Sequence, residues 1–203
     1  NTFLKKWLTM AVAAAYSTDG LATPGVLVFQ GPQYIGKTKW LLSLTPPELN
    51  LAAEGKIVNP SDKDSVKQTV CFWLVELGEL DATFRKSDIA ALKGFLTRQR
   101  DMFRPPYAKQ ECNFARRTVF FGSVNDREFL ADKSGNRRYW TLDVTKIDWD
   151  HGIDMQQLWA EVYEMYRSGT QWWLSDDEMA WLNESNEEFE MVDTIEERLA
   201  TWF

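Results

Sequence analysis

A glycine-rich turn between a short apolar run and a helix-forming run constrains the fold of this chain most. The run VLVFQ at 26–30 is continuous and rich in branched side chains, which is typical of a strand buried on both faces of a parallel sheet. The run KTKWLLSL at 37–44 predicts a helix, which Pro46 stops. The turn between them fits the pattern G-x-x-x-x-G-K-S/T at every required position, namely Gly31, Gly36, Lys37 and Thr38. The sequence therefore predicts a strand, a phosphate-binding loop and a helix, in that order.

The chemistry of such a loop makes a nucleotide the expected ligand, with ATP and Mg²⁺ as cofactors. Backbone N–H groups converge on the phosphates, and the positive end of the following helix points at the same anions. Lys37 would reach the β and γ phosphates, and Thr38 would ligate Mg²⁺ through its hydroxyl. The alternative is a strand–helix connection with a solvent-exposed lysine. The predicted nucleotide-binding residues are Gly31, Pro32, Gln33, Tyr34, Ile35, Gly36, Lys37, Thr38 and Lys39.

Acidic residues follow a second apolar run, VCFWLVE at 70–76. Glu76 would hold the metal through water, and Glu79 would polarise the attacking water. These roles could be exchanged, because the sequence does not fix the direction of either side chain. Asp81 is a weaker third candidate. The alternative is that both glutamates are exposed acids at the end of a strand.

Two further polar features complete the predicted catalytic set. Asn125 ends the third buried run, 116–125, where it could orient the attacking water or sense the γ-phosphate; it could instead cap a turn. Arg137 and Arg138 lie at a turn, and one of them could be supplied to a neighbouring subunit to stabilise the transition state. Plain surface charge is the alternative for both arginines. The predicted catalytic residues are Lys37, Glu76, Glu79, Asn125, Arg137 and Arg138.

The order of elements predicts an α/β fold with a mostly parallel central sheet, because strands alternate with helices. Further helices are expected at 3–16, after Ser61 and Ser87, and at 155–169 and 176–191, and a fourth strand within 132–144. We expect a core domain over 1–150 and a small C-terminal helical segment over 151–203. The chain begins with Asn1 and ends abruptly at Phe203, so we expect a truncated fragment. No run of 18 apolar residues exists, so no membrane span is expected.

The formal charge of −7 is unevenly distributed along the chain. Residues 171–203 hold ten acids and one base, which is most simply a solvated helical face. The stretch 98–117 is basic, with six cations against two acids, and could contact phosphates or be ordinary surface. Cys71 and Cys112 are far apart and form no CxxC pair, so we expect two buried thiols in a reducing cytoplasm.

Taken together, these segments resemble the virulence-associated protein E family of phages and prophages. The stretches GPQYIGKTKW, WLVELGELD, LKGFLTRQRDMFRPPYAK, RRTVFFGSVNDREFLAD and SGNRRYWTLDV follow one another at the family's intervals, over roughly residues 20–145. That family belongs with the superfamily 3 helicase-like ATPases, in the AAA+ class of P-loop NTPases. The resemblance implies a three-layer P-loop fold and a homo-oligomeric ring, with a hexamer as one candidate size. It also implies a primase-type domain in the full-length protein.

The resemblance also implies roles for individual residues. Residues 31–38 would be the Walker A loop, Glu76 and Glu79 the Walker B acids, and Asn125 the sensor. One of the two arginines at 137–138 would be an arginine finger. In superfamily 3 proteins the two Walker B acids are usually adjacent, whereas here two residues separate them, so the identity of the activating acid stays open. The residues expected to face DNA, single-stranded in our hypothesis, are Lys93, Arg98, Arg100, Arg104 and Lys109.

The leading functional hypothesis is an Mg²⁺-dependent, helicase-like ATPase motor that acts in replication of phage or mobile-element DNA. The main alternative is a non-hydrolysing module in which bound nucleotide controls oligomerisation and the binding of DNA or a partner. A third hypothesis, a small-molecule P-loop kinase, would require a lid, and no lid sequence is evident.

Overall fold

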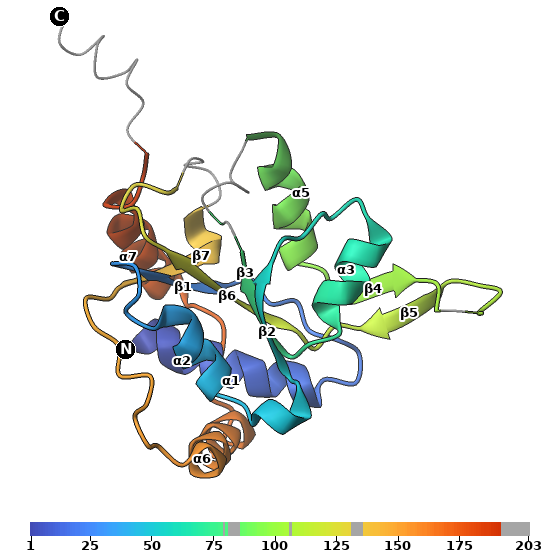
Figure 1. The fold of residues 1–203 in the computed structure, drawn as a ribbon, viewed down its shortest axis with the longest axis horizontal. Helices are drawn as coiled ribbons and strands as arrows, with labels where there is room; N and C mark the ends of the chain where they lie inside the picture. The colour runs from blue at the N-terminus through green and yellow to red at the C-terminus, as the bar shows by residue number, and fades with distance from the viewer. Residues whose placement is uncertain (79, 81–85, 106, 131–135, 192–203) are drawn as a thin grey trace, which may run out of the picture.

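A five-stranded parallel sheet forms the centre of the structure, in the spatial order β2-β3-β6-β1-β7. In this computed structural model, residues 1–78, 80, 86–105, 107–130 and 136–191 are described (Figure 1). The strands are β1 Val26–Gln30, β2 Ala52–Lys56, β3 Leu74–Leu77, β6 Val119–Val124 and β7 Tyr139–Asp143. A separate antiparallel hairpin joins β4 Arg100–Phe103 to β5 Cys112–Ala115.

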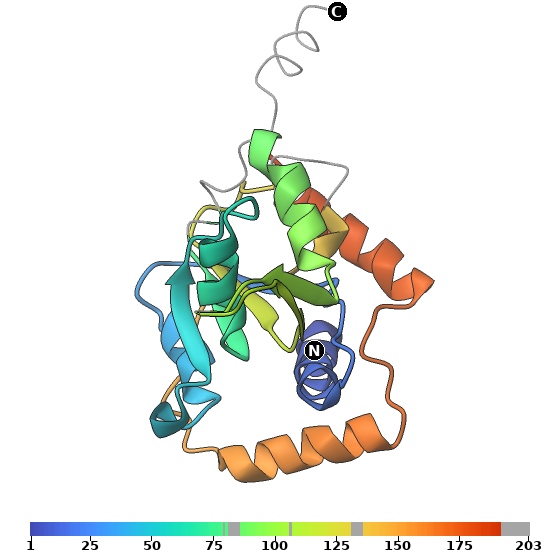
Figure 2. The ribbon, with the colours of Figure 1, turned by 90° about the vertical axis from the view of Figure 1, so that its right-hand side faces the viewer.

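Helices cover both faces of the sheet, so the predicted α/β fold with a parallel sheet is confirmed. They are α1 Thr2–Tyr16, α2 Lys37–Ser43, α3 Lys63–Val70, α5 Lys86–Leu96, α6 Met155–Arg167 and α7 Asp176–Glu187. Short 3₁₀ turns are η1 Pro47–Leu49 and η2 Asn136–Arg138. Figure 2 shows α1 on one face of the sheet with α6 beyond it, and α3 and α5 on the other face.

The alternation of side chains along β1 explains the three layers. Leu27 and Phe29 point into the cluster under α1 and α2, whereas Val26 and Val28 point into the cluster under α3 and α5. Such a strand must be apolar throughout, because both faces are covered. Each fully buried side chain of this size contributes roughly 2 kcal/mol.

The first helix anchors one layer through its apolar stripe. Trp7, Met10, Ala11 and Ala14 recur at helical spacing and are all fully buried. The indole Nε1 of Trp7 donates a hydrogen bond of 2.7 Å to the carbonyl of Phe120 on β6. The helix is therefore fixed across the sheet by both packing and a buried polar contact.

Several elements differ from the prediction. Strand β2 and the β4–β5 hairpin were not predicted. The apolar run 70–76 is a strand only from Leu74, because Val70 is the last residue of α3. The prediction of buried thiols is wrong, since Cys71 and Cys112 are both free and exposed.

The two C-terminal helices α6 and α7 add Val162 and Leu182 to the same core cluster as α1. The division at residue 150 stays a prediction. Among the described residues, no helix has the length and apolar character needed to cross a bilayer.

Candidate nucleotide-binding site

The loop from Gly31 to Gly36 leaves the carboxyl end of β1, which lies between β6 and β7 in the sheet, and leads directly into α2. A Cβ atom at Gly31 would lie 2.0 Å from the carbonyl oxygen of Val144, so only glycine fits this close approach. Gly36 has φ +95°, and a Cβ there would lie 2.4 Å from Cδ1 of Trp149. Both glycines of the sequence pattern are therefore required by the backbone path itself.

Lys37 turns back over the loop that precedes it. Its ammonium donates hydrogen bonds to the carbonyls of Gly31, at 2.6 Å, and Pro32, at 2.9 Å. It also donates to Oδ1 of Asn125, at 2.9 Å, which brings the loop and the end of β6 together. Lys37 is only 7% exposed, so the alternative of a solvent-exposed lysine is wrong.

A carboxylate from β3 meets the start of α2. Glu76 is 4% exposed, and its Oε1 accepts hydrogen bonds from Thr38, at 2.8 Å, and from Ser123 on β6, at 2.7 Å. The alternative of an exposed acid is therefore wrong for Glu76. Two donated hydroxyl hydrogen bonds offset part of the cost of burying this carboxyl group.

The oxygen atoms of Thr38 and Glu76 suit a hard cation. Mg²⁺ is usually held by one or two protein oxygens together with water and substrate phosphates, rather than by a full protein cage. The residues present therefore fit Mg²⁺ that enters with a nucleotide.

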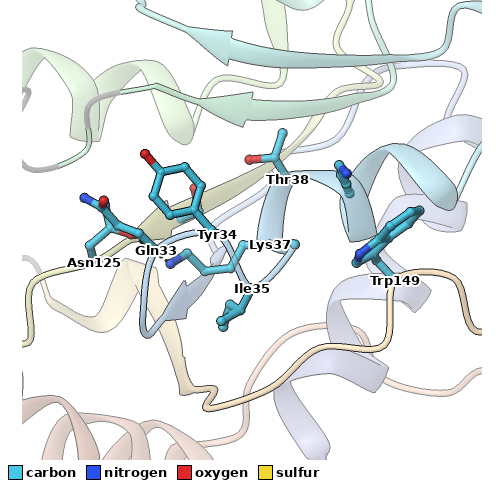
Figure 3. Close-up of a pocket in the computed structure, with 10 residues that line it drawn as sticks. Gln33, Tyr34, Ile35, Lys37, Thr38, Asn125 and Trp149 are labelled. Atoms are coloured by element: carbon cyan, nitrogen blue, oxygen red, sulfur yellow. Dashed lines mark hydrogen bonds between the residues drawn. The ribbon is translucent and has the colours of Figure 1, made fainter.

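Lys37, Thr38 and Asn125 line a cavity of about 480 Å³, whereas Glu76 is linked to it through its hydrogen bonds with Thr38 and Ser123. Figure 3 shows Lys37 in the middle of the lining, with Asn125 on one side and Trp149 on the other. The lining residues are Gln33, Tyr34, Ile35, Gly36, Lys37, Thr38, Lys39, Ser123, Asn125 and Trp149. Of the nine predicted nucleotide-binding residues, all but Gly31 and Pro32 line the cavity, and those two accept hydrogen bonds from Lys37 instead.

Ser123 and Trp149 were not predicted. Ser123 interrupts the apolar run of β6 with a hydroxyl, which could have indicated a polar contact inside the sheet. Trp149 lies in the irregular segment after β7, where no local pattern indicates that the chain returns to the loop.

Among the remaining predicted catalytic residues, Arg137 and Arg138 do not line this cavity. Glu79 and Asp81 lie outside the described residues. Arg137 and Arg138 precede β7, whose first residue Tyr139 pairs with Val26 at the start of β1. Both arginines are therefore at the amino ends of the parallel strands, whereas the loop is at their carboxyl ends. The length of a five-residue strand, roughly 16 Å, separates them.

The predicted DNA-facing residues lie at and near the hairpin, which projects from the sheet in Figure 1. Arg98, Arg100, Arg104 and Lys109 are exposed, and Lys93 on α5 is half-buried. Arg100 pairs with Asp19 at 2.6 Å.

One cation of the basic stretch has a structural role instead. Arg116 is fully buried, where it pairs with Asp101 and donates to the carbonyl of Phe95. Arg116 therefore ties the base of the hairpin to α5 and does not belong to the basic surface.

The family described as virulence-associated protein E-like domain matches residues 1–191. The chain belongs to this family. The resemblance seen in the sequence over roughly 20–145 is thus confirmed and extends over nearly the whole chain. No curated protein is similar to this virulence-associated protein E-like domain.

Solved structures similar to the domain include two of the NrS-1 C-terminal region. Its apo structure has 16% identity and a TM-score of 0.53, with 94% of this chain and 48% of that chain covered. Its A-form apo structure has 14% identity and a TM-score of 0.48, with 93% and 39% covered. The domain therefore spans about half the length of the first of these. At this identity the similarity supports the fold alone.

Proposed function

We propose that this virulence-associated protein E-like domain is an Mg²⁺-dependent, helicase-like ATPase that acts in replication of phage or mobile-element DNA. The observation that carries the proposal is the convergence of Lys37, Glu76 and Asn125 at the carboxyl edge of three adjacent strands. Ligands of open α/β sheets bind at this edge. Family membership supports a role in phage or prophage biology.

The chain's own groups have distinct tasks in this proposal. On binding, the ammonium of Lys37 exchanges its loop carbonyls for the β and γ phosphates of ATP and neutralises their charge. Asn125, already 2.9 Å from Lys37, would lie beside the terminal phosphate, where its amide would orient the attacking water. Bound Mg²⁺ would neutralise charge that develops on the phosphate oxygens.

The acid that accepts the proton of the attacking water is one of two candidates. Glu76 hydrogen-bonds Thr38 and Ser123, which favours a role in positioning the metal-ligating hydroxyl. Glu79 is then the candidate that activates water. The water oxygen attacks the γ-phosphorus, the bond to the leaving ADP oxygen breaks, and the proton passes to the carboxylate.

A ring of subunits would complete the site. Arg137 is exposed at the edge of the sheet opposite the loop, so it cannot reach the phosphates of its own chain. It could reach those of a neighbour, as could the half-buried Arg138. An arginine supplied in trans raises phosphoryl-transfer rates by roughly 10³–10⁵-fold.

The hairpin and its surroundings are the proposed contact with DNA, single-stranded in our hypothesis. Lys63, Arg98 and Arg100 line a second cavity of about 380 Å³ beside the hairpin. Arg104 and Lys109 extend this positive charge towards the hairpin tip. Cations of this kind hold the phosphate backbone without reading its sequence.

A second function, the non-hydrolysing module controlled by nucleotide, is favoured by one observation. Glu76, the described acid that meets the loop, does not line the first cavity, and its Oε1 accepts hydrogen bonds from the hydroxyls of Thr38 and Ser123. A site without an activating carboxylate would bind ATP and change assembly without turnover.

ATP turnover measured against protein concentration, with and without single-stranded DNA, tests the proposal. A ring motor shows turnover per subunit that rises with concentration and with DNA, and that Lys37→Ala abolishes. Turnover that is independent of both would discredit the ring motor. Nucleotide-dependent assembly with no turnover at any concentration would establish the second function.

A further inference from the structure

Trp149 borders the cavity from the segment that follows β7, and part of its indole is open to solvent. It is 41% exposed. One part of the ring covers Gly36, and Nζ of Lys39 lies 4.4 Å from its centroid. A cation at this distance holds an aromatic ring in place through its π face.

The contacts of the loop indicate which end of the cavity would hold the terminal phosphate of a nucleotide. The groups suited to the terminal phosphate gather at one side, where Lys37 meets Asn125 at 2.9 Å and Thr38 meets Glu76 at 2.8 Å. Trp149 lies on the side of Lys37 opposite Asn125 (Figure 3), against Gly36 and with its ring centroid 4.4 Å from Nζ of Lys39. A triphosphate whose terminal phosphate lies beside Asn125 therefore directs its nucleoside towards Trp149.

We propose that Trp149 is the residue on which the nucleotide base stacks, and that Lys39 fixes the orientation of its indole. This inference rests on the proposed function, because it requires a nucleotide in the cavity. Stacking on an aromatic side chain suits any base, since every base has a π face. A base stacked on Trp149 would also bury apolar surface of the indole, which a phosphate chain alone would leave exposed.

Equilibrium binding of two ligands separates the base from the phosphates. Affinities are measured by calorimetry with Mg²⁺ for ATP and for inorganic tripolyphosphate, which lacks a nucleoside. Trp149→Ala should weaken ATP binding roughly 10-fold or more and leave tripolyphosphate binding unchanged. Trp149→Phe, which keeps an aromatic face, should bind ATP within about threefold of the unaltered protein. Lys37→Ala should weaken both ligands.

Matched controls keep the outcome interpretable. Trp173→Ala removes another half-exposed tryptophan, 50% exposed and absent from the cavity lining, and should change neither affinity. Thermal unfolding of each variant identifies any that fail to fold. If Trp149→Ala does not fold, Trp149→Phe is measured with both ligands instead. Equal losses of affinity for ATP and for tripolyphosphate in Trp149→Phe would count against stacking.

The outcomes for the two proposals differ. ATP affinity unchanged in Trp149→Ala, or weakened equally with tripolyphosphate, overturns the stacking role while the nucleotide site stands. If the unaltered protein binds neither ligand more tightly than Lys37→Ala does, the nucleotide site itself is wrong and the stacking role falls with it.

Discussion

Thr38 Oγ1 and Glu76 Oε1 lie 2.8 Å apart, joined by a hydrogen bond from the first turn of α2 to the next-to-last residue of β3. Ser123 donates to the same oxygen from β6, so one carboxylate oxygen links three elements. The hydroxyl expected to ligate Mg²⁺ is therefore held by the acid expected to support the metal. This relationship makes Glu76 a sharp test of the site.

Replacing Glu76 with Gln should reduce ATP turnover by about 100-fold or more, while ATP binding weakens by less than about 10-fold. The amide keeps an oxygen that can accept from Thr38 and Ser123, so the fold should persist, but the negative charge is lost. Steady-state turnover and calorimetric binding measure the two effects. Glu54→Gln changes an exposed acid on β2 and serves as the control. Undiminished turnover in Glu76→Gln would contradict the assigned role.

Mixing two inactive variants tests whether an arginine acts between subunits. Arg137→Ala keeps an intact cavity but lacks the donated side chain, whereas Lys37→Ala lacks the cavity function but keeps the arginine. Their mixture should recover part of the turnover, because an unaltered arginine then faces an unaltered cavity at some interfaces. Arg138→Ala, mixed in the same way, identifies which arginine is donated.

The control for this experiment mixes Lys37→Ala with Glu76→Gln. Both variants are impaired in the same cavity, so no interface becomes complete and no recovery is expected. A mixture of arginine and Lys37 variants that gives only the sum of its parts would refute donation between subunits.

Cations at the hairpin should set the salt dependence of binding to single-stranded DNA. Arg104→Ala and Lys109→Ala should each reduce the slope of log K against log salt by about 0.7, the value for one phosphate contact on a single strand. Fluorescence anisotropy with a labelled oligonucleotide at several salt concentrations gives this slope. Arg167→Ala, an exposed cation at the end of α6, is the matched control. Slopes unchanged by both hairpin variants would place the DNA elsewhere.

The central strands could be predicted because burial dictates their composition. The runs at β1 and β6 must be apolar on both faces, and each ends at a polar or glycine residue that leaves the sheet. Strand β2 could not be predicted, since its sequence AAEGK has no branched or aromatic side chain and the strand, at the edge of the sheet, pairs only with β3. Pairing partners, rather than intrinsic preference, decide such an edge strand.

The hairpin was missed for a related reason. Its stability depends on contacts between distant residues, including the ring stacking of Phe103 on Phe114 at 4.1 Å and the buried pair of Asp101 with Arg116. Neither contact leaves a local pattern, and counting Arg116 as part of the basic surface followed from charge alone. The roles of Lys37 and Glu76 could be predicted, because Lys37 belongs to a sequence motif and Glu76 ends an apolar run. Ser123 and Trp149 depend on how separate segments meet.

The start of α7 links stability to pH through Glu178. Its carboxylate accepts hydrogen bonds from the backbone of Ser175, at 2.7 Å, and pairs with Lys6 on α1 at 2.9 Å. Burial would raise the pKa of Glu178, but the hydrogen bonds from Ser175 and Lys6 outweigh it and bring the pKa below its ordinary value of 4.5. The ionised form therefore stabilises the fold above that pH, and this contribution is lost as the pH falls through the lowered pKa.

Glu178→Gln should lower the free energy of unfolding by about 1 kcal/mol at neutral pH, because it removes the charge from the helix cap and from the pair with Lys6. The difference from the unaltered protein should shrink as the pH falls below 4.5, where Glu178 itself becomes protonated. Urea unfolding at a series of pH values measures this difference. Glu184→Gln, on the exposed face of the same helix, should show little effect at any pH. A difference for Glu178→Gln that stays constant down to pH values well below 4.5 would mean that its charge does not stabilise the cap.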